Sequence, residues 1–247
     1  MLEVRALSKR FGGVTAADEI SLEVRAGEVH ALIGPNGAGK TTLIGLISGS
    51  LAADSGEVLF FQKSLTHAPP YARVRAGLAR SFQATRIFPR FTVLENLALA
   101  VQARTGSSFS FWRPVREETA LFEEAAALAE RIGLSERRDR FAAALAHGEQ
   151  RALEIGLALA TRPRLLLLDE PTAGMGAEES RRMIALIEGV RAGIAVLLVE
   201  HDMDAVFRLA DRVSVLVTGR VIATGTPAEI RANPEVRVAY LGDEGAG

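Results

Sequence analysis

Short apolar runs separated by helical patterns dominate the chain. Val, Ile and Leu are concentrated in four such runs, at residues 29–33, 165–168, 195–199 and 213–217. Runs of this length and composition are typical of parallel strands, because crossover helices bury both faces of a parallel sheet. The pattern therefore predicts an α/β sheet.

The first sixty residues follow a different pattern. Segments 2–7 and 20–25 alternate or pair around the turn-prone Gly12-Gly13, and segment 57–61 follows another glycine turn. Short alternating segments joined by glycine turns are typical of hairpins. We therefore expect an antiparallel β subdomain on the N-terminal side.

Strand signals vanish between about residues 92 and 144. Apolar residues recur there at spacings of four, three and four, at Leu121, Ala125, Leu128 and Ile132. This spacing places them on one helical face and predicts a helical insertion in the α/β core. Segment 104–114 carries Gly, Ser, Pro and three aromatic residues. We expect a loop there, with its aromatics either packing locally or contacting a partner.

Composition narrows the class of protein. The chain has 247 residues, 48% of them hydrophobic, and its 29 basic and 30 acidic residues give a formal net charge of −1. This size and composition favour one large domain, which we place at residues 2–242, followed by a flexible tail at 243–247. The near-zero charge disfavours general nucleic-acid binding, so no nucleic-acid partner is expected. The absence of cysteine excludes a disulfide framework and a cysteine nucleophile.

The apolar runs are too short for a membrane span, which needs roughly 20 residues. The N-terminus mixes charged residues with apolar ones, unlike a secretory signal. We therefore expect a cytoplasmic protein, with any membrane role supplied by a partner.

A glycine-rich segment follows the first buried run. Its residues are Gly34-Pro35-Asn36-Gly37-Ala38-Gly39-Lys40-Thr41, followed by Thr42. It lies between a predicted strand and a predicted helix at 41–48, which is typical of a phosphate-binding loop, because glycines let backbone N–H groups approach phosphate oxygens. Lys40 would add charge at the β and γ phosphates. Thr41 would supply a hydroxyl ligand to Mg²⁺, and Thr42 could reach the α phosphate.

Two carboxylates, Asp169 and Glu170, directly follow the run at 165–168. Ligands bind at the carboxyl ends of strands in doubly wound sheets. Asp169 is therefore expected to hold Mg²⁺, mostly through water, and Glu170 to act as general base for the attacking water. Taken alone, an Asp-Glu pair could simply solvate the end of a strand. His201 follows the run at 195–199 and should reach the same edge, although a lone histidine there is more often a structural hydrogen-bonding group.

Taken together, these residues resemble the nucleotide-binding subunit of ATP-binding cassette (ABC) transporters, over nearly the whole chain. The glutamine, switch histidine and adenine-stacking aromatic of that family match Gln83, His201 and Phe11. Its signature, Leu-Ser-Gly-Gly-Gln, corresponds to Leu145-Ala146-His147-Gly148-Glu149. The resemblance implies a P-loop NTPase (RecA-like) α/β core with the antiparallel β subdomain and a helical subdomain inserted at about 84–160.

The resemblance also implies ATP hydrolysis with Mg²⁺ as cofactor. The implied catalytic residues are Lys40, Gln83, Glu170 and His201, and the implied Mg²⁺ ligands are Thr41, Gln83 and Asp169. The signature would complete the site of a second ABC ATPase subunit, in a homodimer or a heterodimer. Further implied partners are two transmembrane permease subunits and, indirectly, a periplasmic or extracellular solute-binding protein. The chain would then lie on the inner face of the plasma membrane.

Finer features resemble the cassettes of importers for branched-chain amino acids, urea and amides. They include Ser81-Phe82-Gln83 and the segments 147–150, 153–156, 200–203 and 233–235. An exporter of lipid or another substrate, or a non-transport ABC ATPase, stays open as an alternative. The chain departs from the family pattern at Ala146, where the signature has serine, and at Gly176, where many relatives carry aspartate. These departures suggest that the site completed by this signature is weaker than the site built on Lys40.

Overall fold

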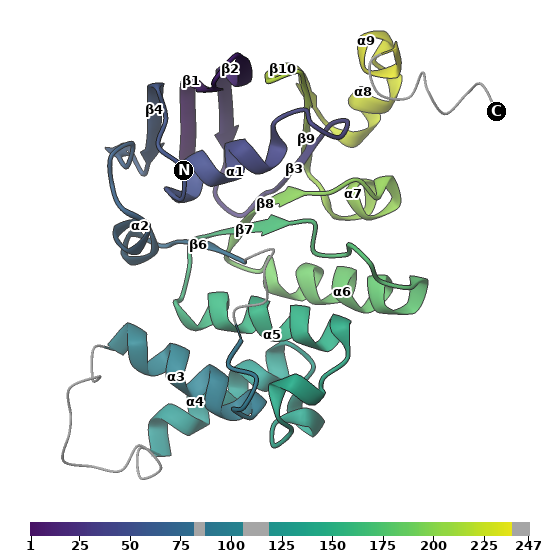
Figure 1. Ribbon diagram of the computed structural model, residues 1–247. Helices are drawn as coiled ribbons and strands as arrows, with labels where there is room; N and C mark the ends of the chain where they lie inside the picture. Colours follow the sequence, from purple (N-terminus) through teal and green to yellow (C-terminus); the bar gives the residue numbers. More distant parts are fainter. Residues whose placement is uncertain (82–86, 106–118, 239–247) are drawn as a thin grey trace.

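Two sheets and a group of helices are stacked in the computed structural model, which describes residues 1–81, 87–105 and 119–238 (Figure 1). The α-helices are α1 (Lys40–Ser48), α2 (Pro70–Ala76), α3 (Val93–Thr105), α4 (Thr119–Arg131), α5 (His147–Ala160), α6 (Ala177–Val190), α7 (Met203–Leu209), α8 (Pro227–Ala232) and α9 (Pro234–Val236). The 3-10 helices Ser135–Arg137 and Ala142–Ala144 lie between α4 and α5.

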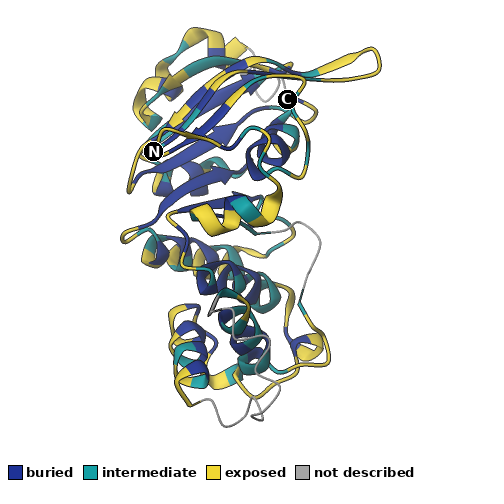
Figure 2. Cartoon of the chain, turned by 90° about the vertical axis from the view of Figure 1, so that its left-hand side faces the viewer, coloured by how far each residue is buried: buried dark blue, intermediate teal, exposed yellow. Residues whose placement is uncertain are grey.

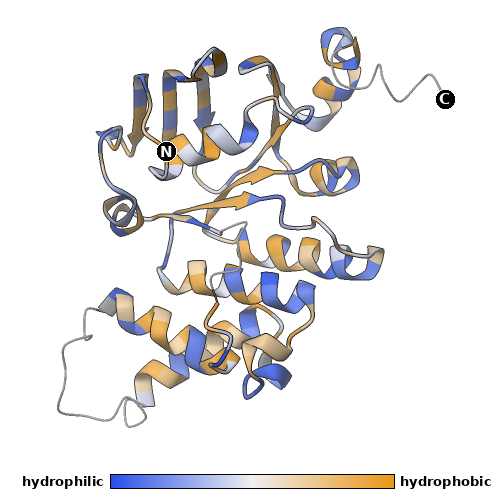
Figure 3. Cartoon of the chain, in the orientation of Figure 1, coloured by the Kyte–Doolittle hydropathy of each residue, from blue (hydrophilic) through white to orange (hydrophobic). Residues whose placement is uncertain are grey.

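The larger sheet has six strands in the order β10-β9-β3-β8-β7-β6. Their bounds are β3 (Val29–Ile33), β6 (Leu78–Arg80), β7 (Leu165–Asp169), β8 (Ala195–Val199), β9 (Arg212–Val217) and β10 (Arg220–Gly225). Neighbouring strands are parallel except for β9 and β10, which are antiparallel. Every residue of β3, β7 and β8 is buried. Figure 3 shows that β7 and β8 are almost wholly hydrophobic. The segments that follow these three strands therefore begin at the same edge of the sheet.

The smaller sheet is antiparallel and has the order β2-β1-β4-β5. Its strands are β1 (Leu2–Phe11), β2 (Val14–Val24), β4 (Ser55–Phe60) and β5 (Lys63–Ser64). A tight turn with Gly12 at φ 58° joins β1 to β2. Helix α1 lies in one hydrophobic cluster with both sheets, which includes Leu43 and Ile47 of α1, Leu22 of β2 and Leu197 of β8. The helix that leaves the glycine-rich loop is thus held between the two sheets.

Helices α3, α4 and α5 form a separate layer, drawn at the bottom of Figure 1. Leu121, Ala125 and Leu128 of α4 are buried, as is Ile132 directly after it, so the predicted apolar face is confirmed. One large hydrophobic cluster joins this layer to α6 and to strands β7 and β8. Figure 2 shows the buried interior running from the sheet into this layer. No helix in the described part of the chain is both long and apolar enough to cross a bilayer.

The predicted loop does not start at residue 104, so that boundary is wrong. Arg104 lies in the last turn of α3, and Thr105 ends that helix. The Arg104 guanidinium donates 2.7 Å hydrogen bonds to both carboxylate oxygens of Glu124 and a third bond to the carbonyl oxygen of Ala160. These contacts with α4 and α5 extend the helix past the expected boundary. Segment 106–114 and the predicted tail at 243–247 lie outside the described residues, and the boundaries 84–160 and 2–242 stay predictions.

Candidate functional site

The glycine-rich loop connects β3 to α1 at the carboxyl edge of the six-stranded sheet. Gly39 has a φ of 105°, a left-handed conformation that favours glycine. A Cβ at Gly39 would overlap the carbonyl oxygen of Ala16 in β2, and one at Gly34 would overlap that of Leu216 in β9. Two approaching backbones therefore require glycine at these positions. Within the loop, Ala38 donates its N–H to the carbonyl oxygen of Pro35 at 3.2 Å.

Lys40 begins α1, and its side chain folds back over the loop. Its Nζ donates hydrogen bonds to the carbonyl oxygens of Gly34 at 2.6 Å and Pro35 at 3.0 Å, and the residue is 6% exposed. Burial lowers the pKa of Lys40, while the charges of Glu170 and Asp169 act in the opposite direction. The ammonium group and the N-terminus of α1 thus bring positive charge to the loop, as phosphate binding requires.

The other loop residues differ in how far they reach solvent. Asn36, Gly37 and Thr41 are exposed, and Pro35, Gly39 and Thr42 are half-buried. The two threonines directly follow Lys40 in the first turn of α1. Their hydroxyl groups therefore stand at the same helix end as the lysine.

Asp169 ends β7, and its carboxylate is buried. Its Oδ2 accepts a 3.0 Å hydrogen bond from Nη2 of Arg80 in the neighbouring strand β6. Burial raises the pKa of Asp169, although the charge and hydrogen bond of Arg80 work against this rise. The other oxygen, Oδ1, is buried and has no hydrogen-bond partner among the residues that the structure describes. An unpartnered buried carboxylate oxygen fits a hard cation such as Mg²⁺ or a water molecule that the cation carries.

Glu170 follows at the strand end in a backbone conformation that is unusual for a glutamate. Its φ is 50°, and its N–H donates to the carbonyl oxygen of Val199 in β8 at 2.9 Å. Its side chain is half-buried, so the carboxylate can contact solvent. His201 comes shortly after the end of β8, with a side chain that is 57% exposed. The predicted base and the predicted switch histidine thus follow adjacent parallel strands.

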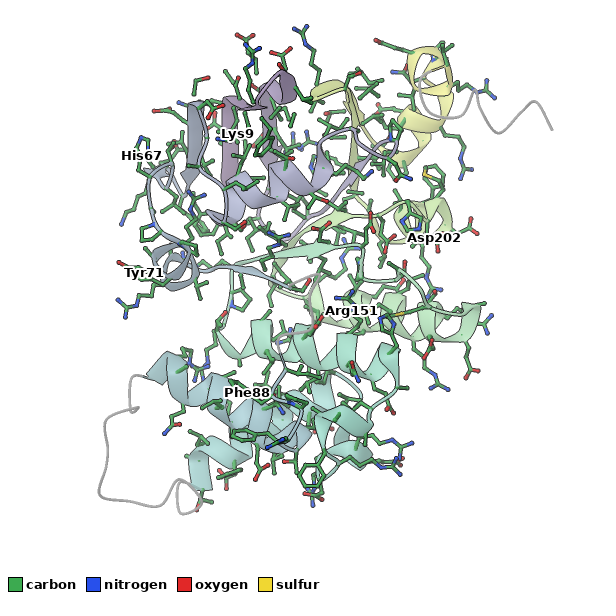
Figure 4. The ribbon with its side chains drawn as sticks, in the orientation of Figure 1. Lys9, His67, Tyr71, Phe88, Arg151 and Asp202 are labelled. Carbon is green, nitrogen blue, oxygen red and sulfur yellow. The ribbon has the colours of Figure 1, made fainter. Side chains whose placement is uncertain are left out.

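Two further residues at this edge were missed by the sequence analysis. Arg80, which binds Asp169, ends a strand of only three residues, too short to show periodicity. Glu200 is fully buried, and its Oε2 accepts the N–H of His201 at 3.1 Å. Its position between a buried run and His201 was the only signal. The following residue, Asp202, labelled in Figure 4, caps α7 by accepting the N–H groups of Asp204 and Ala205.

The predicted signature residues lie at the start of α5. Leu145 is buried, Ala146 and His147 are exposed, and Gly148 and Glu149 are half-buried. Helix α5 begins at His147, so its first turn contains the last three signature residues. The N–H of Ala146 donates to Oε2 of Glu149 at 3.0 Å. A 3.1 Å bond from Arg137 Nε to Oε1 holds the same carboxylate.

Phe11 lies at the end of β1 beside the hairpin turn, with 47% of its surface exposed. Nζ of Lys9, labelled in Figure 4, is 5.6 Å from the ring centroid. An exposed ring of this kind is suited to stacking on a base. Gln83, predicted as a catalytic residue and metal ligand, lies outside the described residues.

Family models and individual relatives agree on the protein family to which this chain is similar. A family model described as "ABC transporter" matches residues 17–173. A second model, described as "Branched-chain amino acid ATP-binding cassette transporter", matches residues 220–246. The high-affinity branched-chain amino acid transport ATP-binding protein LivG of Salmonella typhimurium is 40% identical over 250 residues, covering 98% of each chain. The corresponding BraF protein of Pseudomonas aeruginosa is 39% identical over 250 residues, with the same coverage.

A solved structure is also similar throughout its length. The crystal structure of the ADP conformation of an ATP-binding cassette of an ABC transporter superposes with a TM-score of 0.85 and 32% sequence identity. The match covers 98% of this chain and 98% of the other. The predicted α/β fold of a P-loop NTPase is therefore confirmed.

Proposed function

Because this chain belongs to the ABC transporter family of ATP-binding cassettes, we propose that it is the ATPase subunit of an importer for branched-chain amino acids or related small polar solutes, such as urea and amides. The proposed substrate class rests on the sequence identity with LivG and BraF over 98% of the chain. The second family model, at residues 220–246, supports it independently of the nucleotide site.

The loop and the residues that follow it account for nucleotide binding. Backbone N–H groups from Gly34 to Gly39 would surround the phosphates, and Lys40 would contact the β and γ phosphates. Thr42 would reach the α phosphate, and the exposed ring of Phe11 would stack on adenine. Thr41, Asp169 and Gln83 would hold Mg²⁺, which supplies charge that neutralises the phosphate oxygens.

Hydrolysis would be carried out by residues after β7 and β8. Glu170 is half-buried at the strand end, where its carboxylate could accept a proton from the attacking water. His201 would contact the γ phosphate from the adjacent strand, held by the bond from its N–H to the buried Glu200. Gln83 would help to orient the water.

A second cassette would complete the site. Lys40 and the loop approach the γ phosphate from one side, whereas charge in the transition state spreads over all of its equatorial oxygens. The start of α5, from Ala146 to Glu149, would supply donors to the partner's nucleotide. ATP-driven closure of such a dimer can then shift two transmembrane subunits between states, with a solute-binding protein delivering the substrate. This arrangement would place the chain on the inner face of the plasma membrane.

Uptake measurements in cells that lack the gene test this proposal. Restoring the gene should restore uptake of labelled leucine, isoleucine or valine, or of urea or an amide. Lys40→Ala should not restore uptake, because it removes the buried charge at the phosphate loop. Lys63→Ala makes the same change at an exposed lysine of β5 and should restore uptake fully. Unchanged uptake of all these solutes in the deletion strain, combined with a defect in lipid export, would overturn import in favour of the alternative.

A further inference from the structure

The start of α5, which is proposed to face the nucleotide of a partner cassette, contains a carboxylate. Glu149 occupies the last signature position, where the family pattern has an uncharged glutamine. Its Oε2 accepts the N–H of Ala146 at 3.0 Å, so the carboxylate folds back over the first turn of the helix. A negative charge at this position offsets the positive potential of the helix N-terminus, which otherwise attracts phosphate. Glu149 alone would therefore weaken the affinity of the signature for the γ phosphate of a partner's ATP.

Arg137 brings a counter-charge to this carboxylate from a different segment. It ends the 3-10 helix Ser135–Arg137, and its Nε donates to the other oxygen of Glu149, Oε1, at 3.1 Å. The side chains of Arg137 and Glu149 are 38% and 30% exposed. An ion pair this exposed contributes little to stability. Its influence on an anion bound beside it would be larger, because a partner cassette covering the surface would exclude water and reduce screening.

The other charged groups around the start of α5 do not offset Glu149. Within residues 1–81, 87–105 and 119–238, Arg137 is the only basic residue bound to its carboxylate. Glu179 of α6 adds a second negative charge, because a Cβ at Gly148 would lie 3.3 Å from its Oε1. Arg182 of α6 lines the same cavity but pairs with Glu178. Two further charged residues of opposite sign line this cavity, Glu130 and Arg131.

We infer that Arg137 neutralises Glu149 and thereby allows the signature of this chain to receive the γ phosphate of a partner's ATP. Without the signature hydroxyl at Ala146, the remaining donors are backbone N–H groups, whose attraction for an anion depends on the local potential. Arg137 acts through Glu149, so it is a positioning residue. Its role rests on the proposed function, in which the start of α5 faces the partner's nucleotide.

The test measures nucleotide binding to the assembled transporter that carries Arg137→Gln. Dissociation constants are determined for a fluorescent, non-hydrolysable ATP analogue and for the matching ADP analogue. Their ratio reports the contribution of the γ phosphate, because a general loss of binding changes both constants alike. We expect Arg137→Gln to lower the preference for the ATP analogue about three- to tenfold, because the charge of Glu149 is left without a counter-charge. An unchanged ratio overturns the inference.

Adding Glu149→Gln to Arg137→Gln tests whether the two residues act through charge. Glutamine can keep the contact with the Ala146 N–H but removes the negative charge that Arg137 offsets. The double variant should therefore recover the wild-type ratio to within about twofold. A ratio that stays low would show that Arg137 contacts the nucleotide itself, which overturns neutralisation of Glu149 as its role. Arg137→Lys retains the positive charge and should keep most of the preference for the ATP analogue.

Arg138→Gln is the matched control, because it removes the same charge from the next residue. Nε of Arg138 donates to the exposed Asp139 at 3.4 Å rather than to a signature residue, and its side chain is 55% exposed. The control should leave the ratio unchanged. An equal fall in Arg138→Gln would show that any lost positive charge in this segment has the same effect, and would overturn the inference.

Ala146→Asp separates the inference from the proposed function. Aspartate is favoured at the N-cap of a helix, so the variant should fold while it places an unpaired charge at the start of α5. If its ratio equals that of the wild type, the start of α5 does not face the partner's nucleotide, and the proposed composite site and the inference both fail. If the ratio falls in Ala146→Asp but not in Arg137→Gln, only the inference fails.

Discussion

Glu200 accepts two hydrogen bonds from Thr172. The backbone N–H of Thr172 donates to Oε1 at 3.0 Å, and its hydroxyl donates to the same oxygen at 2.6 Å. The other oxygen of Glu200 accepts the N–H of His201 at 3.1 Å. One buried carboxylate therefore joins the turn after β7 to the turn after β8, and it fixes the spacing between Glu170 and His201.

We expect strong coupling between Thr172 and Glu200 in a double-mutant cycle. Thr172→Val removes the hydroxyl donor, and Glu200→Gln removes the charge while keeping the shape. Because the pair is buried, the coupling free energy should be about 1–3 kcal/mol, measured by urea unfolding of the four proteins. Thr226 and Glu229 make the same two contacts at the exposed N-terminus of α8, and this control pair should couple less. Equal coupling in the two pairs would contradict the expectation.

Glu170 carries backbone strain at the position of the proposed base. With a φ of 50°, Glu170→Gly should be more stable than Glu170→Ala by about 1 kcal/mol, because alanine keeps the Cβ that disfavours this conformation. Both variants and Glu170→Gln should lose hydrolysis by about 10²–10⁴-fold while still binding ATP. Urea unfolding, steady-state ATPase rates and nucleotide binding measure the three effects. A Glu170→Ala protein as stable as Glu170→Gly would show that the strain is absent.

Substitutions at Gly39 and Gly37 distinguish the cost of a close contact from the cost of backbone strain. Both have positive φ, 105° and 80°, but a Cβ at Gly39 would overlap the Ala16 carbonyl oxygen, whereas one at Gly37 would meet nothing within 4 Å. Gly37→Ala should therefore cost about 1 kcal/mol from strain alone. Gly39→Ala should cost about 2 kcal/mol or more and weaken nucleotide binding, because β2 and the loop must separate. Thermal unfolding and nucleotide titration compare the two variants. Equal losses of stability and of nucleotide affinity would exclude the contact with Ala16.

The sequence predicted the fold best where burial is uniform. The runs at 29–33 and 195–199 match β3 and β8 residue for residue, because strands buried on both faces are rich in apolar residues. Strand β6 was not predicted, because its three residues, Leu78–Arg80, are too few to show a pattern. Its place beside β7 depends on pairing between Leu78 and Leu165, which are far apart in the sequence.

In the candidate site, too, features formed by consecutive residues could be predicted, whereas contacts between distant residues could not. The phosphate loop was predicted from a local motif, since strand, loop and helix are consecutive in the chain. The ion pair between Arg80 and Asp169 joins residues 89 positions apart, and the bond between Thr172 and Glu200 spans 28 positions. No local spacing encodes such contacts. They follow from the order of strands in the sheet, which a single sequence does not give.

Ala146→Ser tests whether the missing signature hydroxyl weakens the proposed composite site. Ala146 precedes α5 in an extended conformation, and its N–H already donates to Glu149. Serine would add the second half of a capping box and stabilise α5 by about 0.5–2 kcal/mol. In the assembled transporter its hydroxyl would also contact the partner's γ phosphate, so the ATPase rate should rise.

Ala146→Gly separates these two effects of serine. Glycine is also favoured at the N-cap of a helix but brings no hydroxyl, so it should stabilise α5 without raising the rate. Unfolding of the isolated chain measures the cap, and ATPase rates of the complex measure the hydroxyl. A serine variant with the wild-type rate, or a glycine variant whose rate rises equally, would mean that Ala146 does not limit that site.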